Sequence, residues 1–202
     1  MNGLTKQAKT LNSTQIKLIR TYLKSRRNGL RNETIFLLSV FSGLRAIEIS
    51  RLSWKHVVKS DGTLDDYINL PNDSSKGKSG GRVIPLHKDI KSNLFDMFVI
   101  QSRLKSFDIE KSFVIRTERT PFTTSSTIVN MFLSWYGRLG IIGCSSHSGR
   151  RTFITETSKK ISTVGGSLRD IQALAGHSSL QTTQRYIECD SESQRKVINL
   201  LH

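Results

Sequence analysis

The run Ile35-Phe36-Leu37-Leu38-Ser39-Val40-Phe41 is apolar on nearly every side of a helix. A helix with this pattern must be covered by other elements all round, so the run predicts the central core helix of the fold, over about residues 31–42. Gly43 follows and is expected to end that helix, because glycine adopts the left-handed conformation at a helix C-terminus without steric cost.

A short second helix is predicted directly after this glycine, over residues 44–52. Arg45 and Glu48 are three residues apart within it and therefore share one face. An arginine in the turn after a buried helix is held rigidly, which suits a side chain that grips an anion.

The remaining elements follow from the spacing of apolar residues and from turn signals. Ser145 or Ser146 is expected to cap the helix that begins at His147. Helices are predicted over about residues 13–28, 87–106, 124–140, 147–164, 168–175 and 191–201, with Leu18, Phe95, Leu104 and Leu133 among the residues facing inward. Strands are predicted over residues 67–71, 81–86 and 113–115, the first two joined by the polar loop 72–80. The expected fold class is therefore mainly α with a small antiparallel β-sheet (α+β).

The length of 202 residues fits one domain. We expect a flexible basic segment over residues 1–10, a folded domain over residues 11–190 and a C-terminal helix over residues 191–202. No apolar run approaches the ~20 residues that cross a bilayer, and no signal peptide is apparent, so a cytoplasmic protein is expected. Cys144 and Cys189 lack the spacing of a zinc site.

The charge of the chain is strongly positive, with 31 Lys and Arg against 16 Asp and Glu, a net +15. Such a balance predicts attraction to a polyanion, and nucleic acid is the first candidate. A solvated basic surface with no ligand is the alternative. The N-terminal helix contributes Lys17 and Arg20 to an almost purely basic segment that can lie along a phosphate backbone.

Two further segments carry residues suited to phosphate chemistry. His147 and Arg150 lie one turn apart at the N-terminus of a predicted helix, where free backbone N–H groups also favour an anion. His177 follows Ala175-Gly176, and Tyr186 comes nine residues later. Structural readings stay open at this point: Arg150 can pair with a surface carboxylate, His147 can cap a helix, and a tyrosine at such a spacing is usually a core or surface residue.

Taken together, these residues form an inventory for metal-free phosphoryl transfer. Two guanidinium groups can hold the non-bridging oxygens of a phosphodiester and stabilise the charge of the transition state. A lysine at the tip of loop 72–80 can protonate a departing alkoxide, and histidines can move protons near neutral pH. No acidic pair or metal-ligand cluster is apparent, so a two-metal nuclease is disfavoured and no cofactor is expected.

At these positions the sequence resembles the catalytic domain of the tyrosine recombinases, the phage integrase family. The resemblance extends from about Thr10 to Tyr186 and rests on four motifs in order: Gly43-Leu44-Arg45-Ala46-Ile47-Glu48-Ile49, Ser75-Lys76-Gly77-Lys78 before Arg82-Val83-Ile84-Pro85-Leu86, His147-Ser148-Gly149-Arg150-Arg151-Thr152-Phe153, and Leu174-Ala175-Gly176-His177-Ser178-Ser179 with Thr182-Thr183 and Tyr186.

The resemblance implies a role for each matched residue. Tyr186 would attack a DNA phosphodiester to form a 3′-phosphotyrosine link, and the freed 5′ hydroxyl of another strand would reverse the attack. The phosphate would be held by Arg45, Arg150 and His177, with His147 assisting proton transfer, Lys76 as the general acid and Glu48 supporting Arg45. The residues expected to contact DNA elsewhere are Arg82, Arg151, Lys17 and Arg20. The helix after Tyr186 would pack on a neighbouring protomer, because family members assemble as homotetramers on two DNA sites.

The sequence departs from the family pattern at several points. The usual spacing before Pro85 falls on Gly77, between Lys76 and Lys78, so Lys78 remains the alternative general acid. Gly149 replaces a common apolar residue, and Arg151 stands where histidine is frequent. Only about ten residues precede the predicted domain, where most members carry another DNA-clamping domain.

Three functions fit these residues. The first is a site-specific DNA recombinase of a bacterium, phage or mobile element, acting near the nucleoid with double-stranded DNA and possible accessory DNA-bending proteins. The second is a non-catalytic DNA-binding regulator of recombinase ancestry, which would not need Tyr186. The third is a type IB topoisomerase, which uses the same chemistry to relax DNA.

Overall fold

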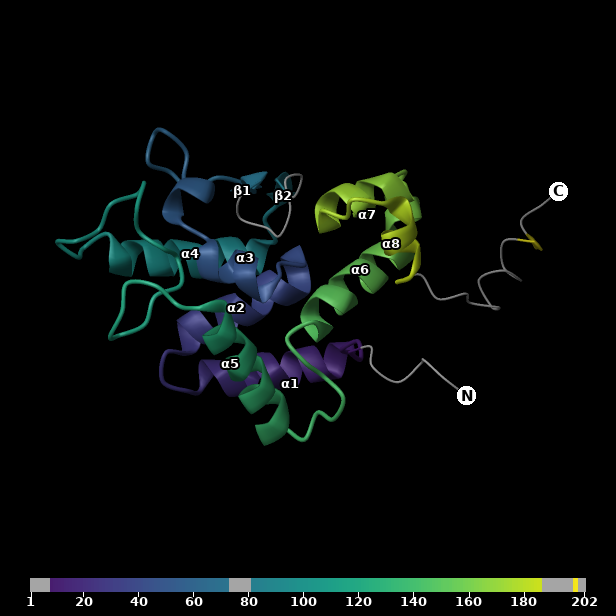
Figure 1. Cartoon of the computed structure of the whole chain (residues 1–202), viewed down its shortest axis with the longest axis horizontal. Coiled ribbons are helices and arrows are strands. Elements are labelled where there is room, and N and C mark those ends of the chain that lie inside the picture. Colours follow the sequence, from purple (N-terminus) through teal and green to yellow (C-terminus); the bar gives the residue numbers. More distant parts are fainter. Residues whose placement is uncertain (1–7, 73–80, 187–197, 200–202) are drawn as a thin grey trace.

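The computed structural model describes residues 8–72, 81–186 and 198–199. The described chain is mainly helical with one antiparallel pair of strands, which confirms the predicted fold class (Figure 1). Its elements are α1 (Ser13–Lys24), α2 (Gly29–Ser42), α3 (Ala46–Arg51), the 3₁₀ turn η1 (Trp54–His56), β1 (Tyr67–Leu70), β2 (Arg82–Pro85), α4 (Lys88–Gln101), α5 (Ser125–Arg138), α6 (Ser148–Lys160), the 3₁₀ turn η3 (Ile161–Val164), α7 (Leu168–Ala175) and α8 (Leu180–Gln184).

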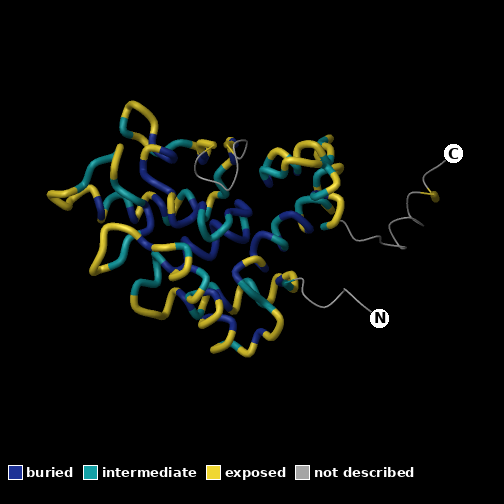
Figure 2. The backbone as a smooth tube through the Cα atoms, in the orientation of Figure 1, coloured by how far each residue is buried: buried dark blue, intermediate teal, exposed yellow. Residues whose placement is uncertain are grey.

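Helix α2 is the centre of the main core, as its apolar run predicts. Nine consecutive residues, 32–40, are buried, and α1, α4 and α6 all pack against it (Figure 2). Gly43 ends the helix at φ +63°, in the left-handed conformation that favours glycine. The first arginine, Arg45, is therefore placed two residues beyond a fully packed helix.

The two strands pair in antiparallel register, with Ile68 opposite Ile84 and Leu70 opposite Arg82. The alternation of side chains turns these four residues toward the interior. The third predicted strand is wrong: in residues 113–115 only Phe113 forms an isolated bridge, to Ser53. Val114 and Ile115 are completely buried, so the apolar run reflects burial rather than strand pairing.

Several predicted helix limits and inward-facing residues are also wrong. Helix α4 ends at Gln101, and α1 ends at Lys24. The buried face of α4 consists of Ile90, Leu94, Met97 and Gln101. Gln101 can lie inside the core because its side chain accepts a hydrogen bond from the Trp54 indole and donates one to the Val114 carbonyl. The apolar residues outside the buried faces remain in solvent: Leu18, Phe95, Leu104 and Leu133 are 40–58% exposed.

A second, smaller core joins α6, α7 and α8. It consists of Ile154, Ile171 and Ala175, with Tyr186 among the residues packed against it. Figure 1 shows these three helices as a group beside the larger body that holds α2 and the sheet. The most extensive link between the two cores is the contact of α6 with α2, where Gly149 lies against Ser39 and Gly43 against Phe153.

Parts of the expectations fall outside the described residues. These are the segment 1–7, the hairpin tip 73–80 with Lys76 and Lys78, Cys189, and most of the predicted helix over residues 191–202. Within residues 8–72, 81–186 and 198–199, no helix is both long and apolar enough to cross a membrane.

Candidate active site

One cleft brings together five of the six residues expected to be catalytic. It has a volume of about 380 Å³ and is lined by Ala8, Arg45, His147, Arg150, Arg151, His177, Thr182, Arg185 and Tyr186. The sixth residue, Lys76, and its alternative Lys78 lie outside the described residues. A larger hollow of about 1020 Å³ beside β2 contains none of these five and is not the place where the candidate chemistry assembles.

Glu48 holds Arg45 at the start of α3, in keeping with the prediction that the two residues share one helix face. Its backbone N–H donates to Glu48 Oε2 at 2.8 Å, and one terminal N–H donates to Oε1 at 2.9 Å. The Glu48 side chain is completely buried, whereas that of Arg45 is 31% exposed. One edge of the guanidinium is thus anchored while the group still lines the cleft.

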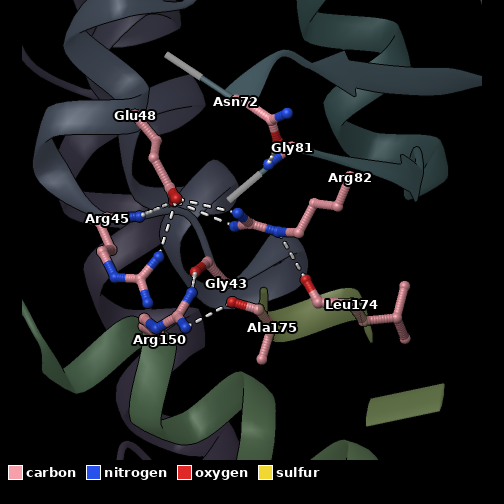
Figure 3. A network of polar contacts seen from close by, with 9 residues as sticks. All are labelled: Gly43, Arg45, Glu48, Asn72, Gly81, Arg82, Arg150, Leu174 and Ala175. Carbon is pink, nitrogen blue, oxygen red and sulfur yellow. Dashed lines mark hydrogen bonds and ion pairs between the residues drawn. The ribbon is translucent and has the colours of Figure 1, made fainter. Parts of the chain in front are cut away.

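Arg150 is buried between two backbone carbonyls. Its terminal nitrogens donate to the carbonyl oxygens of Gly43, at 2.7 Å, and Ala175, at 2.6 Å (Figure 3). A guanidinium has five N–H donors, so the two bonds leave donors for an anion in the cleft. Burial, and then the charge of Arg45, lowers the pKa of Arg150 to about 9, so the group is still cationic at neutral pH.

The carbonyls that hold Arg150 explain how it is placed. Gly43 is the end of α2, and Ala175 is the end of α7. Because Arg150 itself is on α6, its side chain ties three helices together at the cleft. The alternative in which Arg150 pairs with a surface carboxylate is excluded by its burial, with only 4% of the residue exposed.

His177 and Tyr186 are neighbours across the turn and the short helix α8. Their rings stack with centroids 5.5 Å apart, and His177 Nδ1 lies 3.0 Å from Thr183 Oγ1. The backbone of Tyr186 is fixed by its N–H to the Thr183 carbonyl and by the Thr155 hydroxyl, which donates to the Tyr186 carbonyl. The tyrosine is therefore anchored to both α8 and α6.

His177 is neutral at physiological pH. Burial lowers its pKa to about 4, and the charges of Arg150, Arg45 and Arg82 act in the same direction. In the tautomer whose Nδ1 accepts a hydrogen bond from the Thr183 hydroxyl, the neutral ring carries its proton on Nε2, where it can donate to an anion.

His147 is exposed and occupies the N-cap position of α6. The expected cap by Ser145 or Ser146 is therefore wrong by one or two residues. The serines still order the turn: the Ser145 hydroxyl accepts the His147 N–H, and the Ser148 hydroxyl accepts the Ser145 N–H. His147 is thus presented to the cleft at the helix N-terminus.

Arg82 lies in a different place from the one expected for a DNA contact. Its side chain is 4% exposed, and both of its terminal nitrogens donate to Glu48, at 2.9 and 3.0 Å. Its Nε donates to the carbonyl of Leu174 at 2.8 Å. The sequence does hold a signal for this position, because Arg82 is in step with Ile84 on the buried face of β2.

The basic residues of α1 differ from each other. Lys17 is exposed, in keeping with the expected contact to a phosphate backbone. Arg20 is engaged by Glu33 at 2.9 Å and by Asp89 at 2.7 Å, so its charge is used to join α1, α2 and α4. Arg151 lines the cleft beside Arg150.

The buried polar groups of the site carry an excess of positive charge. Arg45, Arg82 and Arg150 surround a single carboxylate, that of Glu48 (Figure 3). Among the part of the chain that the structure describes, no group of His, Cys, Asp and Glu side chains is arranged to hold a metal ion. The cleft is suited to a phosphate or another small anion.

The sequence matches the phage integrase family over residues 9–193. Tyrosine recombinase XerA from Thermococcus kodakarensis is 27% identical over 190 residues, covering 93% of this chain and 61% of the relative. Tyrosine recombinase XerC from Staphylococcus epidermidis is 24% identical over 183 residues, covering 89% of this chain and 56% of the relative. The chain thus spans less than two thirds of the length of these relatives.

Solved structures share the fold. The Tn1549 transposon integrase in complex with a circular intermediate DNA superposes with a TM-score of 0.75 at 18% identity, over 100% of this chain and 68% of that one. The XerA recombinase superposes with a TM-score of 0.72 at 21% identity, over 94% of this chain and 64% of that one. With a match that runs through nearly every described element and a fold that agrees with it, this chain belongs to the phage integrase family.

Proposed function

We propose that this chain carries out site-specific recombination of double-stranded DNA through a 3′-phosphotyrosine intermediate. The observation that carries the proposal is the single cleft in which Arg45, Arg150, His177 and Tyr186 meet from four separate segments. Relatives named as tyrosine recombinases and neighbours solved on DNA support the same assignment. Integration, excision and inversion all use this chemistry.

The reaction begins with Tyr186. Its phenolic oxygen attacks the scissile phosphorus, a new P–O bond forms to the tyrosine, and the P–O bond to the 5′ oxygen breaks. The phenol proton leaves through His147, and the departing 5′ oxygen gains a proton from Lys76, or from Lys78 in the alternative assignment. The 5′ hydroxyl of a second strand then attacks the phosphotyrosine, and its proton passes back to the lysine. The P–O bond to Tyr186 breaks and the phenol oxygen regains its proton from His147, so a phosphodiester is restored without an external energy source.

The cationic groups stabilise the transition state. Arg45 and Arg150 donate N–H bonds to the non-bridging oxygens, whose negative charge grows as phosphorus becomes five-coordinate. His177, which is neutral, adds a hydrogen bond rather than a charge. Each of these groups is held in advance by protein partners, so little reorganisation is needed when the phosphate enters.

The assembly follows from the same chemistry. Complete exchange cuts both strands of two DNA sites, and each subunit supplies one Tyr186, so we propose a homotetramer, with residues 191–202 packing on a neighbouring protomer. Lys17 and Arg151 are proposed to contact the DNA backbone, and accessory proteins that bend DNA are proposed as further partners.

A covalent-trapping experiment tests the proposal. The chain is incubated with nicked duplexes carrying a site that it selects from a random DNA pool, and adducts are separated on a denaturing gel. Wild type should form a protein–DNA adduct, and Tyr186→Phe should bind the site but form none. Binding without an adduct for wild type would favour a non-catalytic regulator, and relaxation of plasmids lacking the site would favour a topoisomerase.

A further inference from the structure

Arg82 is a buried arginine that the proposed chemistry does not use. It is absent from the residues that line the cleft, and its guanidinium is 4% exposed. Yet it lies against three parts of the site at once: it bonds Glu48 on α3 and the carbonyl of Leu174 on α7 (Figure 3), and it packs beside Gly176 in the turn before His177. Placing a cation at such a junction needs a reason beyond packing, because burying a charge is costly.

The first contact governs Arg45. Each oxygen of Glu48 accepts two bonds, so Oε1 serves the terminal nitrogens of Arg45 and Arg82, and Oε2 serves the Arg45 N–H and the other Arg82 nitrogen. Burial alone would raise the pKa of Glu48, but the bonds and charge of Arg82, followed by those of Arg45, hold it below its ordinary value. Arg82 therefore keeps the carboxylate both ionised and saturated.

Saturation matters because two guanidiniums compete for one carboxylate. With Arg82 in place, Arg45 bonds Glu48 through a single side-chain N–H at 2.9 Å, and its remaining donors are left for the cleft. Without Arg82, both oxygens of a fully buried carboxylate lose a partner. The nearest cation, Arg45, would then turn its fork toward Glu48 and away from the phosphate position.

The second and third contacts of Arg82, with Leu174 and Gly176, act on the side of the cleft that holds Arg150 and His177. Arg82 Nε fixes the Leu174 carbonyl at 2.8 Å, and the next carbonyl along the chain, that of Ala175, holds Arg150. Gly176 then turns with φ +61°, and a Cβ at this position would lie 2.8 Å from the Arg82 terminal nitrogen. The guanidinium thus packs directly beneath the turn that leads to His177.

We propose that Arg82 is a positioning residue, which sets the phosphate-binding geometry of Arg45 and Arg150 without touching the DNA. The proposal rests on the proposed function, since it concerns the same site. Arg82 is also close in sequence to the candidate general acids: it is the first residue of β2, and the segment that carries the two candidate lysines comes shortly before it. The group that fixes the arginines is therefore attached to the strand that leads to the general acid.

The test is Arg82→Met in the full chain, which keeps an unbranched apolar stem and removes the guanidinium with its charge. The rate of adduct formation on the nicked site, under single-turnover conditions, should fall by about 10²–10³-fold, the loss typical of a misplaced transition-state donor. Site affinity in a gel-shift assay should change by less than about threefold. Arg27→Met is the matched control, because Arg27 forms an Arg–Glu fork with Glu118 at the surface, and it should retain the wild-type rate.

A second variant separates positioning from structural support. Combining Arg82→Met with Glu48→Gln removes the negative charge that would capture Arg45, so the double variant should form adduct at least about tenfold faster than Arg82→Met alone. A merely structural Arg82 predicts the opposite, because the double variant loses more of the buried network. Circular dichroism and thermal unfolding confirm which variants fold, and if Arg82→Met does not, Arg82→Gln, which also removes the charge, replaces it in both tests.

The outcomes are distinct from those of the proposed function. No adduct from wild type on a site that it binds overturns the proposed recombination itself. If wild type forms adduct and a folded Arg82→Met forms it within about threefold of the same rate, the positioning role is wrong. A rate loss matched by an equal loss of affinity, with no gain from Glu48→Gln, also overturns it. If Arg82→Lys forms adduct as fast as wild type, the pair of bonds from Arg82 to Glu48 is not needed.

Discussion

Gly149→Ala should destabilise the protein, although alanine is normally the better helix residue. Gly149 is the second residue of α6, and a Cβ there would overlap Ser39 Oγ, lie 2.9 Å from Ser39 Cβ and 3.2 Å from the Ser39 carbonyl carbon. Rotating the serine side chain relieves only the first contact. The closest approach of α6 to α2 therefore has to open.

The magnitude follows from two opposing effects. Alanine gains at most about 1 kcal/mol over glycine in a helix. Overpacking a buried contact costs about 1–3 kcal/mol. We expect a net loss of about 1–2 kcal/mol in the free energy of unfolding, or roughly 2–8 °C in Tm for a chain of this size. Because Arg150 is the next residue and reaches back to the Gly43 carbonyl, the adduct rate should fall as well.

The assay is thermal and urea unfolding of Gly149→Ala beside Gly137→Ala. Gly137 is also near the end of a helix, α5, but a Cβ there meets nothing within 4 Å, so this variant should be neutral or slightly stabilised. Adding Ser39→Gly to Gly149→Ala removes the opposing side chain, and the two changes should couple favourably by about 1 kcal/mol or more. A Gly149→Ala protein at least as stable as wild type would refute the packing argument.

Three further predictions concern the site. Arg150→Ala should leave site affinity within about tenfold but slow adduct formation by about two orders of magnitude or more, because a transition-state contact is lost; gel shift and single-turnover trapping measure the two, and an unfolded variant would mean that Arg150 is structural. The free energy of unfolding should fall as the pH drops from about 6.5 toward 4, because the unfolded His177 ring takes a proton near pH 6.5 whereas the folded ring has a pKa of about 4. The measurement is the free energy of unfolding in urea at pH 7 and at pH 5. It should fall by about 1 kcal/mol more in wild type than in His177→Gln, a figure reduced for the solvent around a half-buried ring. Equal falls in the two proteins would contradict the lowered pKa of His177. Adduct formation should be unchanged in EDTA, since all the proposed steps use side chains, and recovery of a lost rate by Mg²⁺ would count against them.

Much of the secondary structure of this chain can be predicted from local sequence. The apolar run in residues 35–41 predicts the core helix because a helix without a polar face has no stable place except the interior. Gly43 marks the end of a helix through a backbone preference that acts within a few residues. The motifs also name five residues that the structure brings together in one cleft, Arg45, His147, Arg150, His177 and Tyr186, whose catalytic roles stay predictions.

The predictions that proved wrong concern burial and strand pairing, which depend on contacts with residues distant in the chain. Phe95 and Leu133 have the right residue type for a core but lie on helix faces that no element within the described part of the chain covers. Residues 113–115 have the composition of a strand and form only a single bridge, since strand pairing depends on a second segment and not on the run itself.

Arg82 shows the limit most clearly. Its residue type and its basic surroundings predict a DNA contact, whereas its position on the inward face of β2 carries it to Glu48, 34 residues away, and to Leu174, 92 residues away. The sequence by itself determined most of the helices and the strand pair, and it named the candidate residues for the chemistry, because helix periodicity and motif spacing are local. Only the tertiary structure decided which cations face the cleft and which lie beneath it, because that depends on the long-range packing of α3, α6, α7 and β2 around one buried carboxylate.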